Sequence, residues 1–247
     1  MKLWHGVVTG VIAYVIFVVA GAPASKLLPL LQPVLPGVHA SGVEGTVWAG
    51  TAAAVQAPPV QLHNVSWRFR PFALLLGRAE VSIDGQLRGR QLQGRAGRAL
   101  FGQPYLAQVR GSVAAQDVLS WMRLNQVGLD GVFSFDLGDV QWSDAPWPAV
   151  NGTLNWAPAN VTRPVALALG KAQLDTRIED GVTRGKLQAS EGALLVQGDV
   201  ELQPAGNYRL QAQLQQKGDV PPEVSTFLTT FTEYKNGNYL FEWSDAL

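Results

Sequence analysis

The chain has 247 residues, of which 47% are hydrophobic and only 15% are charged, and its formal net charge is zero. This composition predicts a packed core, excludes a disordered chain, and gives no overall field that would draw the protein to nucleic acid. The chain has no cysteine, which excludes disulfides and thiolate chemistry, and its three histidines show no metal-binding spacing, so we expect no metal and no cofactor.

The N-terminal segment predicts a membrane span. Residues 6–22 carry no charge, and nine of these seventeen residues are Val, Ile or Phe. At about 0.3 to 0.6 kcal/mol each, the nine side chains favour insertion by roughly 3 to 5 kcal/mol. We therefore predict a transmembrane anchor at residues 1–24. A cleaved signal peptide is the alternative, because residues 20–22 are small. Either way, the remaining chain is exported.

A proline-rich stretch follows at residues 25–40. Proline lacks a donor N–H group and fixes φ, so this stretch is a poor helix. We expect either a stiff spacer or the first loop of the domain.

Most of the remaining chain alternates between apolar and polar residues. In "NVSWRFRP", for example, Val65, Trp67 and Phe69 point to one side, and Ser66 and Arg68 point to the other. This period of two indicates strands that bury one face and expose the other, as in an antiparallel sheet. Turns are expected between strands at Asp84–Gly85, Asp130–Gly131, Asp180–Gly181 and Asn236–Gly237. Exposed edges of such a sheet could recruit partner strands. Residues 115–125 and 221–231 instead show helical spacing, so the predicted fold is mainly β, a twisted antiparallel sheet with two short helices.

Several short motifs occur twice in the same order. "VEGTVWAG" at residues 43–50 resembles "VNGTLNWAP" at 150–158, "GRAEV" at 77–81 resembles "GKAQL" at 170–174, and "DGVFSF" at 130–135 resembles "NGNYLF" at 236–241. These repeats predict an internal duplication, with a first β unit at residues 41–147 and a second at 148–247, either as separate units or within one continuous sheet. The alternative is that these motifs are ordinary hairpin turns, because Gly-Thr and Asn-Gly are common in any β protein.

No nucleophile–base pair or facing pair of carboxylates is legible, so we expect no catalytic residues. Trp147 lies between two prolines and is the strongest candidate for a contact residue. An arginine run indicates a solvated sheet face or a patch for an acidic partner or anionic lipid, and two aromatic residues of one strand could line an apolar groove. The full set of candidate partner or lipid contacts is Trp147, Arg88, Arg90, Arg95, Arg98, Trp67 and Phe69.

Residues 41–55 and 62–81, together with "YKNGNYLFEW" at 234–243, resemble the type II secretion system protein N family. The resemblance implies a single-pass protein of the cell inner membrane with its bulk in the periplasm, an accessory part of the apparatus that exports folded proteins across the outer membrane. It implies no enzymatic activity, and it points to inner-membrane secretion platform proteins or the outer-membrane secretin as partners. Trp67, Pro71, Leu74, Leu75 and Gly77 also resemble AsmA-like envelope proteins, which suggests lipid binding in an apolar β groove as the alternative.

Overall fold

The structure, a computed structural model, describes residues 21–26, 37–124 and 126–246. Residues 1–20 of the predicted anchor and residues 27–36 of the predicted spacer lie outside these ranges. Within the described ranges, no helix is long and apolar enough to cross a bilayer. The chain divides into two compact units, residues 1–89 and 90–247, and each is described by itself.

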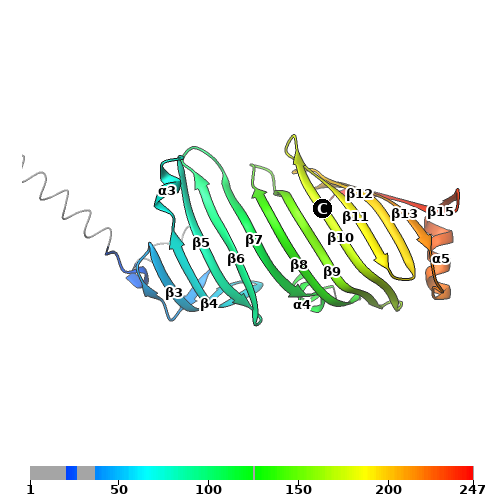
Figure 1. Cartoon of the computed structure of the whole chain (residues 1–247), viewed down its shortest axis with the longest axis horizontal. Coiled ribbons are helices and arrows are strands. Elements are labelled where there is room, and N and C mark those ends of the chain that lie inside the picture. Colours follow the sequence, from blue (N-terminus) through cyan, green and yellow to red (C-terminus); the bar gives the residue numbers. More distant parts are fainter. Residues whose placement is uncertain (1–20, 27–36, 125, 247) are drawn as a thin grey trace, which may run out of the picture. The chain divides into compact units, whose positions relative to one another are not determined.

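The first unit is a small antiparallel sheet (Figure 1). Its strands lie in the order β1-β3-β4-β5, and β2 pairs with β3. A short helix, α3, follows β4. The elements are β1 (His39–Ser41), β2 (Glu44–Gly45), β3 (Ala49–Ala57), β4 (Val60–Phe69), α3 (Pro71–Leu74) and β5 (Arg78–Leu87). Since β1 pairs with β3 along His39–Ser41, the end of the predicted spacer belongs to this sheet.

The second unit is a larger sheet in which consecutive strands are neighbours from β6 to β13, followed by β15 and then β14. The strand pairs from β6–β7 through β14–β15 are antiparallel, as the alternating sequence predicts. The elements are β6 (Arg90–Ala99), β7 (Pro104–Ala114), α4 (Ala115–Met122), β8 (Gly128–Gln141), β9 (Ala149–Arg163), β10 (Leu167–Glu179), β11 (Val182–Glu191), β12 (Leu194–Leu202), β13 (Asn207–Gln216), α5 (Pro222–Phe231), β14 (Glu233–Lys235) and β15 (Asn238–Ala246).

Both predicted helices are present. Helix α4 begins at the fully buried Ala115 and ends where Arg123 adopts the left-handed conformation. Helix α5 begins with Pro222, because proline fits the first turn of a helix, where its missing N–H group has no partner to lose. Leu228 anchors α5 and is only 1% exposed. The sequence did not predict the short helix α3.

The order of elements along the chain matches what a duplication predicts. Five strands, a helix and a strand (β3 to β7, α4, β8) are followed by five strands, a helix and a final hairpin (β9 to β13, α5, β14 and β15). One pair of motifs does not fit this count, because "GRAEV" lies at the third strand of the first run and "GKAQL" lies on the second strand of the second run. The compact units also divide after Gly89 and not after residue 147. The duplication therefore stays a prediction.

Candidate functional site

Side chains directly opposite each other on paired strands share a face of the sheet. In the second unit, the register places apolar residues opposite one another in rows that cross eight strands. One row runs from β7 to β15 through Val113, Phe133, Trp156, Ala172, Ala189, Val196, Leu214 and Tyr239. The next runs through Gly111, Phe135, Leu154, Leu174, Leu187, Gly198, Ala212 and Phe241. We call these two rows the apolar face.

Small residues let large ones settle on this face. A Cβ atom at Gly111 would come within 2.9 Å of the Phe135 ring, so the ring lies directly over the glycine. Phe133 and Trp156 pack together with ring centroids 5.4 Å apart. The large side chains of the apolar face therefore shield one another.

Cover from other elements is limited to the ends of the face. Within the described part of the second unit, α4 contacts chiefly β7 and β8, and α5 contacts chiefly β15. Leu154, Leu174 and Leu187, in the middle of the face, are only half-buried. Full burial of a leucine is worth about 1.5 to 3 kcal/mol relative to exposure, so a partner that covered the face would gain free energy. Extended apolar surfaces of this kind mark contacts with proteins or lipids.

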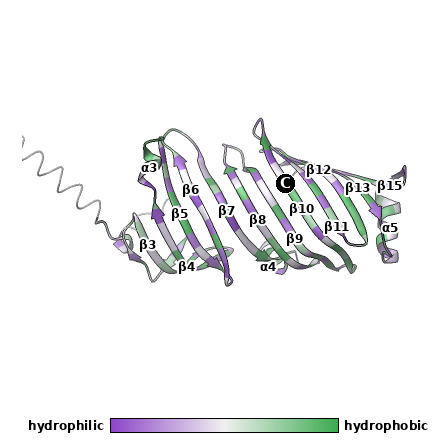
Figure 2. Cartoon of the chain, in the orientation of Figure 1, coloured by the Kyte–Doolittle hydropathy of each residue, from purple (hydrophilic) through white to green (hydrophobic). Residues whose placement is uncertain are grey.

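The opposite face is polar and solvated. On each strand, the residue between the two apolar rows points to this opposite face. These residues are Ser112, Ser134, Asn155, Gln173, Gln188, Gln197, Gln213 and Leu240. The alternation is visible along single strands in Figure 2, where green and purple segments follow one another. The strands crossed by these rows, β7 to β13 and β15, therefore separate a polar from an apolar surface.

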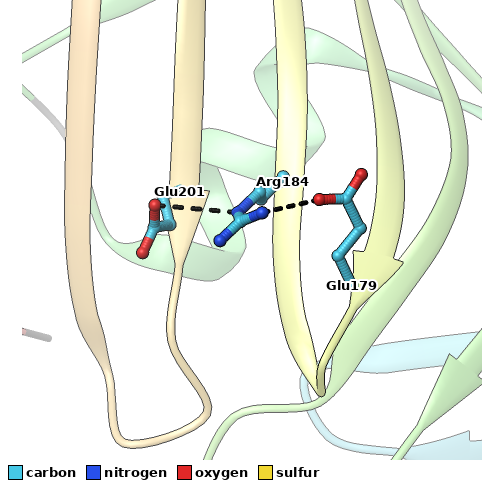
Figure 3. Close-up of polar contacts among 3 residues, drawn as sticks. All are labelled: Glu179, Arg184 and Glu201. Carbon is cyan, nitrogen blue, oxygen red and sulfur yellow. Dashed lines mark hydrogen bonds and ion pairs between the residues drawn. The ribbon is translucent and has the colours of Figure 1, made fainter.

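Charges on the polar face are paired across strands. Arg110 contacts Asp136 at 2.9 Å, and Lys171 contacts Glu191 at 2.8 Å. Arg184 lies between Glu179, at 2.6 Å, and Glu201, at 3.9 Å (Figure 3). The hydrogen bond to Glu179 and the nearby negative charges raise the pKa of Arg184. These cross-strand pairs neutralise the polar face.

Trp147 lies where the sequence predicts, in the loop between β8 and β9, and it is 39% exposed. Its backbone N–H donates to the carbonyl oxygen of Pro204 at 3.2 Å, which holds this loop against the loop between β12 and β13. Its role as a contact residue stays a prediction.

The arginines do not form one compact patch. Arg88 is an exposed turn residue of the first unit, whereas Arg90, Arg95 and Arg98 lie along β6 in the second. Arg90 and Arg98 are eight residues apart on one strand, or about 26 Å at 3.3 Å per residue. Arg98 Nε donates to the Gly102 carbonyl oxygen at 3.1 Å. A single docking site for these arginines would have to extend along most of β6.

Trp67 and Phe69 are half-buried and hold the first unit together. The Trp67 indole N–H donates to the carbonyl oxygen of Thr46 at 3.2 Å, and a Cβ atom at Gly50 would lie 2.4 Å from the indole ring. Phe69 packs edge-on against Trp48, with centroids 5.0 Å apart. The repeated "VEGTVWAG" motif thus provides a glycine and a carbonyl group to seat a tryptophan of the next strand.

A second apolar surface was missed by the sequence reasoning. It lies in the first unit, where Phe72, Leu75 and Leu76, in and after α3, are 77–83% exposed. The available signal was their position, because runs of large apolar residues are unusual at the ends of strands, where polar turn residues normally stand. Among the described residues, no group of three or more His, Cys, Asp or Glu side chains could hold a metal ion.

Comparison with known proteins gives the relatives of this chain. A family model described as "Type II secretion system (T2SS), protein N" matches residues 36–240. The type II secretion system protein N of Vibrio cholerae serotype O1 is 28% identical over 86% of this chain and 85% of its own length. The protein of the same name from Pectobacterium carotovorum is 28% identical over 93% and 92%, and that from Aeromonas hydrophila is 29% identical over 86% and 86%.

No solved structure matches the chain. The family match covers most of the chain, including strands β7 to β13 of the apolar face and residues 41–55 and 62–81, which carry much of the resemblance seen in the sequence. The chain therefore belongs to the type II secretion system protein N family.

Proposed function

We propose that the protein is an accessory component of the type II secretion system, anchored in the inner membrane by its N-terminal segment, and that it acts in the periplasm by binding other proteins of the apparatus. Family membership supports a role in the secretion pathway. The observation that carries the binding role is the apolar face, which spans eight strands and which, among the described elements, has its chief helix contacts near its two ends.

The mechanism is association driven by burial of apolar surface. A partner segment laid across the middle of the face would cover Leu154, Leu174 and Leu187, which are half-buried in the free chain. The polar face offers less, because exposed ion pairs contribute little free energy to binding or stability. Trp147 adds a further aromatic contact. Inner-membrane platform proteins and the outer-membrane secretin are the partners that this role predicts.

Lipid binding is the second candidate, and the same face favours it. Its rows of Leu, Phe, Val and Ala offer no charge to an acyl chain across β7 to β15, as an apolar binding surface requires. The two candidates therefore differ in the occupant and not in the surface. An experiment must identify what lies on the face in cells.

The test is photo-crosslinking in cells from neighbouring residues that lie on opposite faces. A photoreactive amino acid replaces Leu174 or Leu187 on the apolar face, and matched controls replace Gln173 or Gln188 on the polar face of the same strands. A further probe replaces Trp147. We expect the Leu174, Leu187 and Trp147 probes to capture secretion-system proteins and the glutamine probes to capture none.

Two results would decide against the proposal. Capture of phospholipid alone at Leu174 and Leu187 would support the second candidate. Equal capture from both faces, or none from either, would show that the apolar face is not the binding surface.

A further inference from the structure

We propose that residues 71–77, "PFALLLG", which we call the apolar turn, insert into the surface of the membrane beside the N-terminal anchor. This inference goes beyond the proposed function and rests on one part of it, the prediction that residues 1–24 form the anchor. It assigns a membrane contact to the first unit, separate from the apolar face of the second.

The side chains of the apolar turn project into solvent. Phe72 is 80% exposed, Leu75 is 83% exposed and Leu76 is 77% exposed. Leu74 is partly covered, with 45% of its surface exposed. Four large apolar side chains thus stand within five residues, and none of them is buried.

The backbone of the turn uses its own hydrogen-bond donors. The N–H groups of Leu75, Leu76 and Gly77 donate to the carbonyl oxygens of Phe72, Ala73 and Leu74 at 3.2, 3.0 and 2.9 Å. Unsatisfied backbone groups are what most opposes transfer of a peptide segment into lipid. At these three positions the backbone donors of the apolar turn are already hydrogen-bonded within the turn. Its side chains are therefore left to face the lipid.

The base of the turn carries a small excess of positive charge. Residues 68–84 contain Arg68, Arg70 and Arg78 and two acidic residues, Glu80 and Asp84, so three positive charges exceed two negative charges by one. Arg70 contacts Glu80 at 3.3 Å. A hydrophobic tip with a basic base matches a membrane surface that carries anionic phosphate headgroups, because the arginines interact at headgroup level while the tip enters the acyl region.

Backbone contacts tie the apolar turn to the end of the predicted anchor. Val47 N–H donates to the carbonyl oxygen of Ala22 at 3.2 Å. The residue after Val47 is Trp48, and its carbonyl oxygen accepts a hydrogen bond from Phe69 N–H at 2.6 Å. Phe72 follows Phe69 by three residues. At strand spacings of about 4.8 Å and about 3.5 Å per residue along the chain, Phe72 lies within roughly 25 Å of Ala22. The anchor therefore holds the apolar turn close to the bilayer.

The absence of cysteine from the natural chain allows a direct test. Single cysteines at Leu75 or Leu76 in the full chain carry an environment-sensitive fluorophore, and the protein is reconstituted into vesicles of phosphatidylcholine with phosphatidylglycerol. Gln61→Cys is the matched control: it is exposed, lies in the same unit, and stands at the opposite end of β4 from the turn. Because all three side chains are at the surface or nearly so, we expect these variants to fold.

We expect the Leu75 and Leu76 probes to shift their emission to the blue and to be quenched by spin-labelled lipid, whereas the Gln61 probe is quenched by aqueous iodide. Replacing phosphatidylglycerol with phosphatidylcholine should weaken lipid quenching at the turn. Access of iodide to Leu75 and Leu76, or shielding from both quenchers, would overturn the proposal; the second result would show that protein covers the turn.

One further measurement separates this proposal from the prediction on which it depends. Resistance of the full chain to alkaline extraction from the same vesicles tests the anchor alone.

Discussion

Replacing Gly50 with alanine tests the packing that unites the first unit. Three atoms crowd the position: a Cβ atom would lie 2.4 Å from the carbonyl oxygen of Glu44, 2.4 Å from Cζ2 of Trp67 and 2.9 Å from Cη2 of the same ring. The carbonyl oxygen belongs to β2 and the ring is held by the bond to Thr46, so neither can move freely. The Gly50→Ala variant must therefore displace the Trp67 indole or separate β2 from β3.

The free-energy cost follows from the contacts that are lost. Overpacking costs about 1 to 3 kcal/mol, and loss of the Trp67–Thr46 hydrogen bond costs about 0.5 to 1.5 kcal/mol. Alanine also restricts the unfolded chain, which returns about 0.4 to 1 kcal/mol. We expect a net destabilisation of the first unit of about 2 kcal/mol, or roughly thirtyfold in its opening equilibrium.

Hydrogen exchange measured by mass spectrometry on peptides from β3 and β4 of the full chain reports this opening. Gly138→Ala on β8 is the control, because its nearest neighbour would be 3.6 Å from the new Cβ atom and its exchange should change little. Unchanged exchange in β3 and β4 of the Gly50 variant would refute the packing argument. If hydrogen exchange were accelerated equally around Gly50 and Gly138 in the two variants, the loss of a glycine, and not crowding by Trp67, would be responsible for the faster exchange.

Two further predictions concern the second unit. Trp156→Phe keeps the ring contact with Phe133 but removes the indole N–H that donates to the Asp130 carbonyl oxygen at 2.8 Å, so urea unfolding should show a loss of about 1 kcal/mol; unchanged stability would mean that solvent replaces this bond without cost. The pKa of Arg184 is raised in the folded chain, so its pairing with Glu179 stabilises the fold at every pH below the ordinary pKa of the guanidinium group. This stabilisation is lost only as the pH rises through the raised pKa. Arg184→Gln should therefore change the unfolding midpoint equally at about pH 6 and pH 9, and a difference between the two would contradict this assignment.

The sequence predicted some turns and misplaced others that contain the same residues. Asp180–Gly181 and Asn236–Gly237 form the expected two-residue turns, with φ values of 52° and 77° in the first and 53° and 86° in the second. Asp84–Gly85 was wrongly expected to be a turn and lies inside β5, where Gly85 comes close to Val65 on β4. Local residue chemistry permits both outcomes, and the neighbouring strand decides between them.

Asp130–Gly131 shows the same limit in more detail. The dipeptide was predicted to turn but lies near the start of β8, at an irregularity in the pairing with β9. There the Asp130 side chain accepts a hydrogen bond from the N–H of Gly131 at 2.8 Å, and its backbone carbonyl oxygen accepts the Trp156 indole N–H. The glycine is needed because a Cβ atom at this position would clash with the carbonyl oxygen of Pro158 on β9, which is 27 positions away along the chain.

The candidate site was predictable in kind but not in extent. Alternation along single strands predicts one apolar side for each strand, and the observed pairs agree, as in Trp67 opposite Ile83. Whether these sides join into one surface depends on the register of every pair, which sequence alone does not provide. The exposed residues of the apolar turn were missed for another reason: large apolar side chains are normally assigned to the core.

The edges of the second unit's sheet favour its face as the binding surface. Edge strand β14 has only three residues, and two of them, Glu233 and Lys235, are charged. A short, charged edge strand disfavours pairing with a strand from another chain. The apolar face has no comparable charged protection, since Leu174 and Leu187 face each other in its centre. A partner that approaches this unit therefore gains most by covering side chains on the face, and capture at Leu174 but not at Gln173 is the result that this reasoning requires.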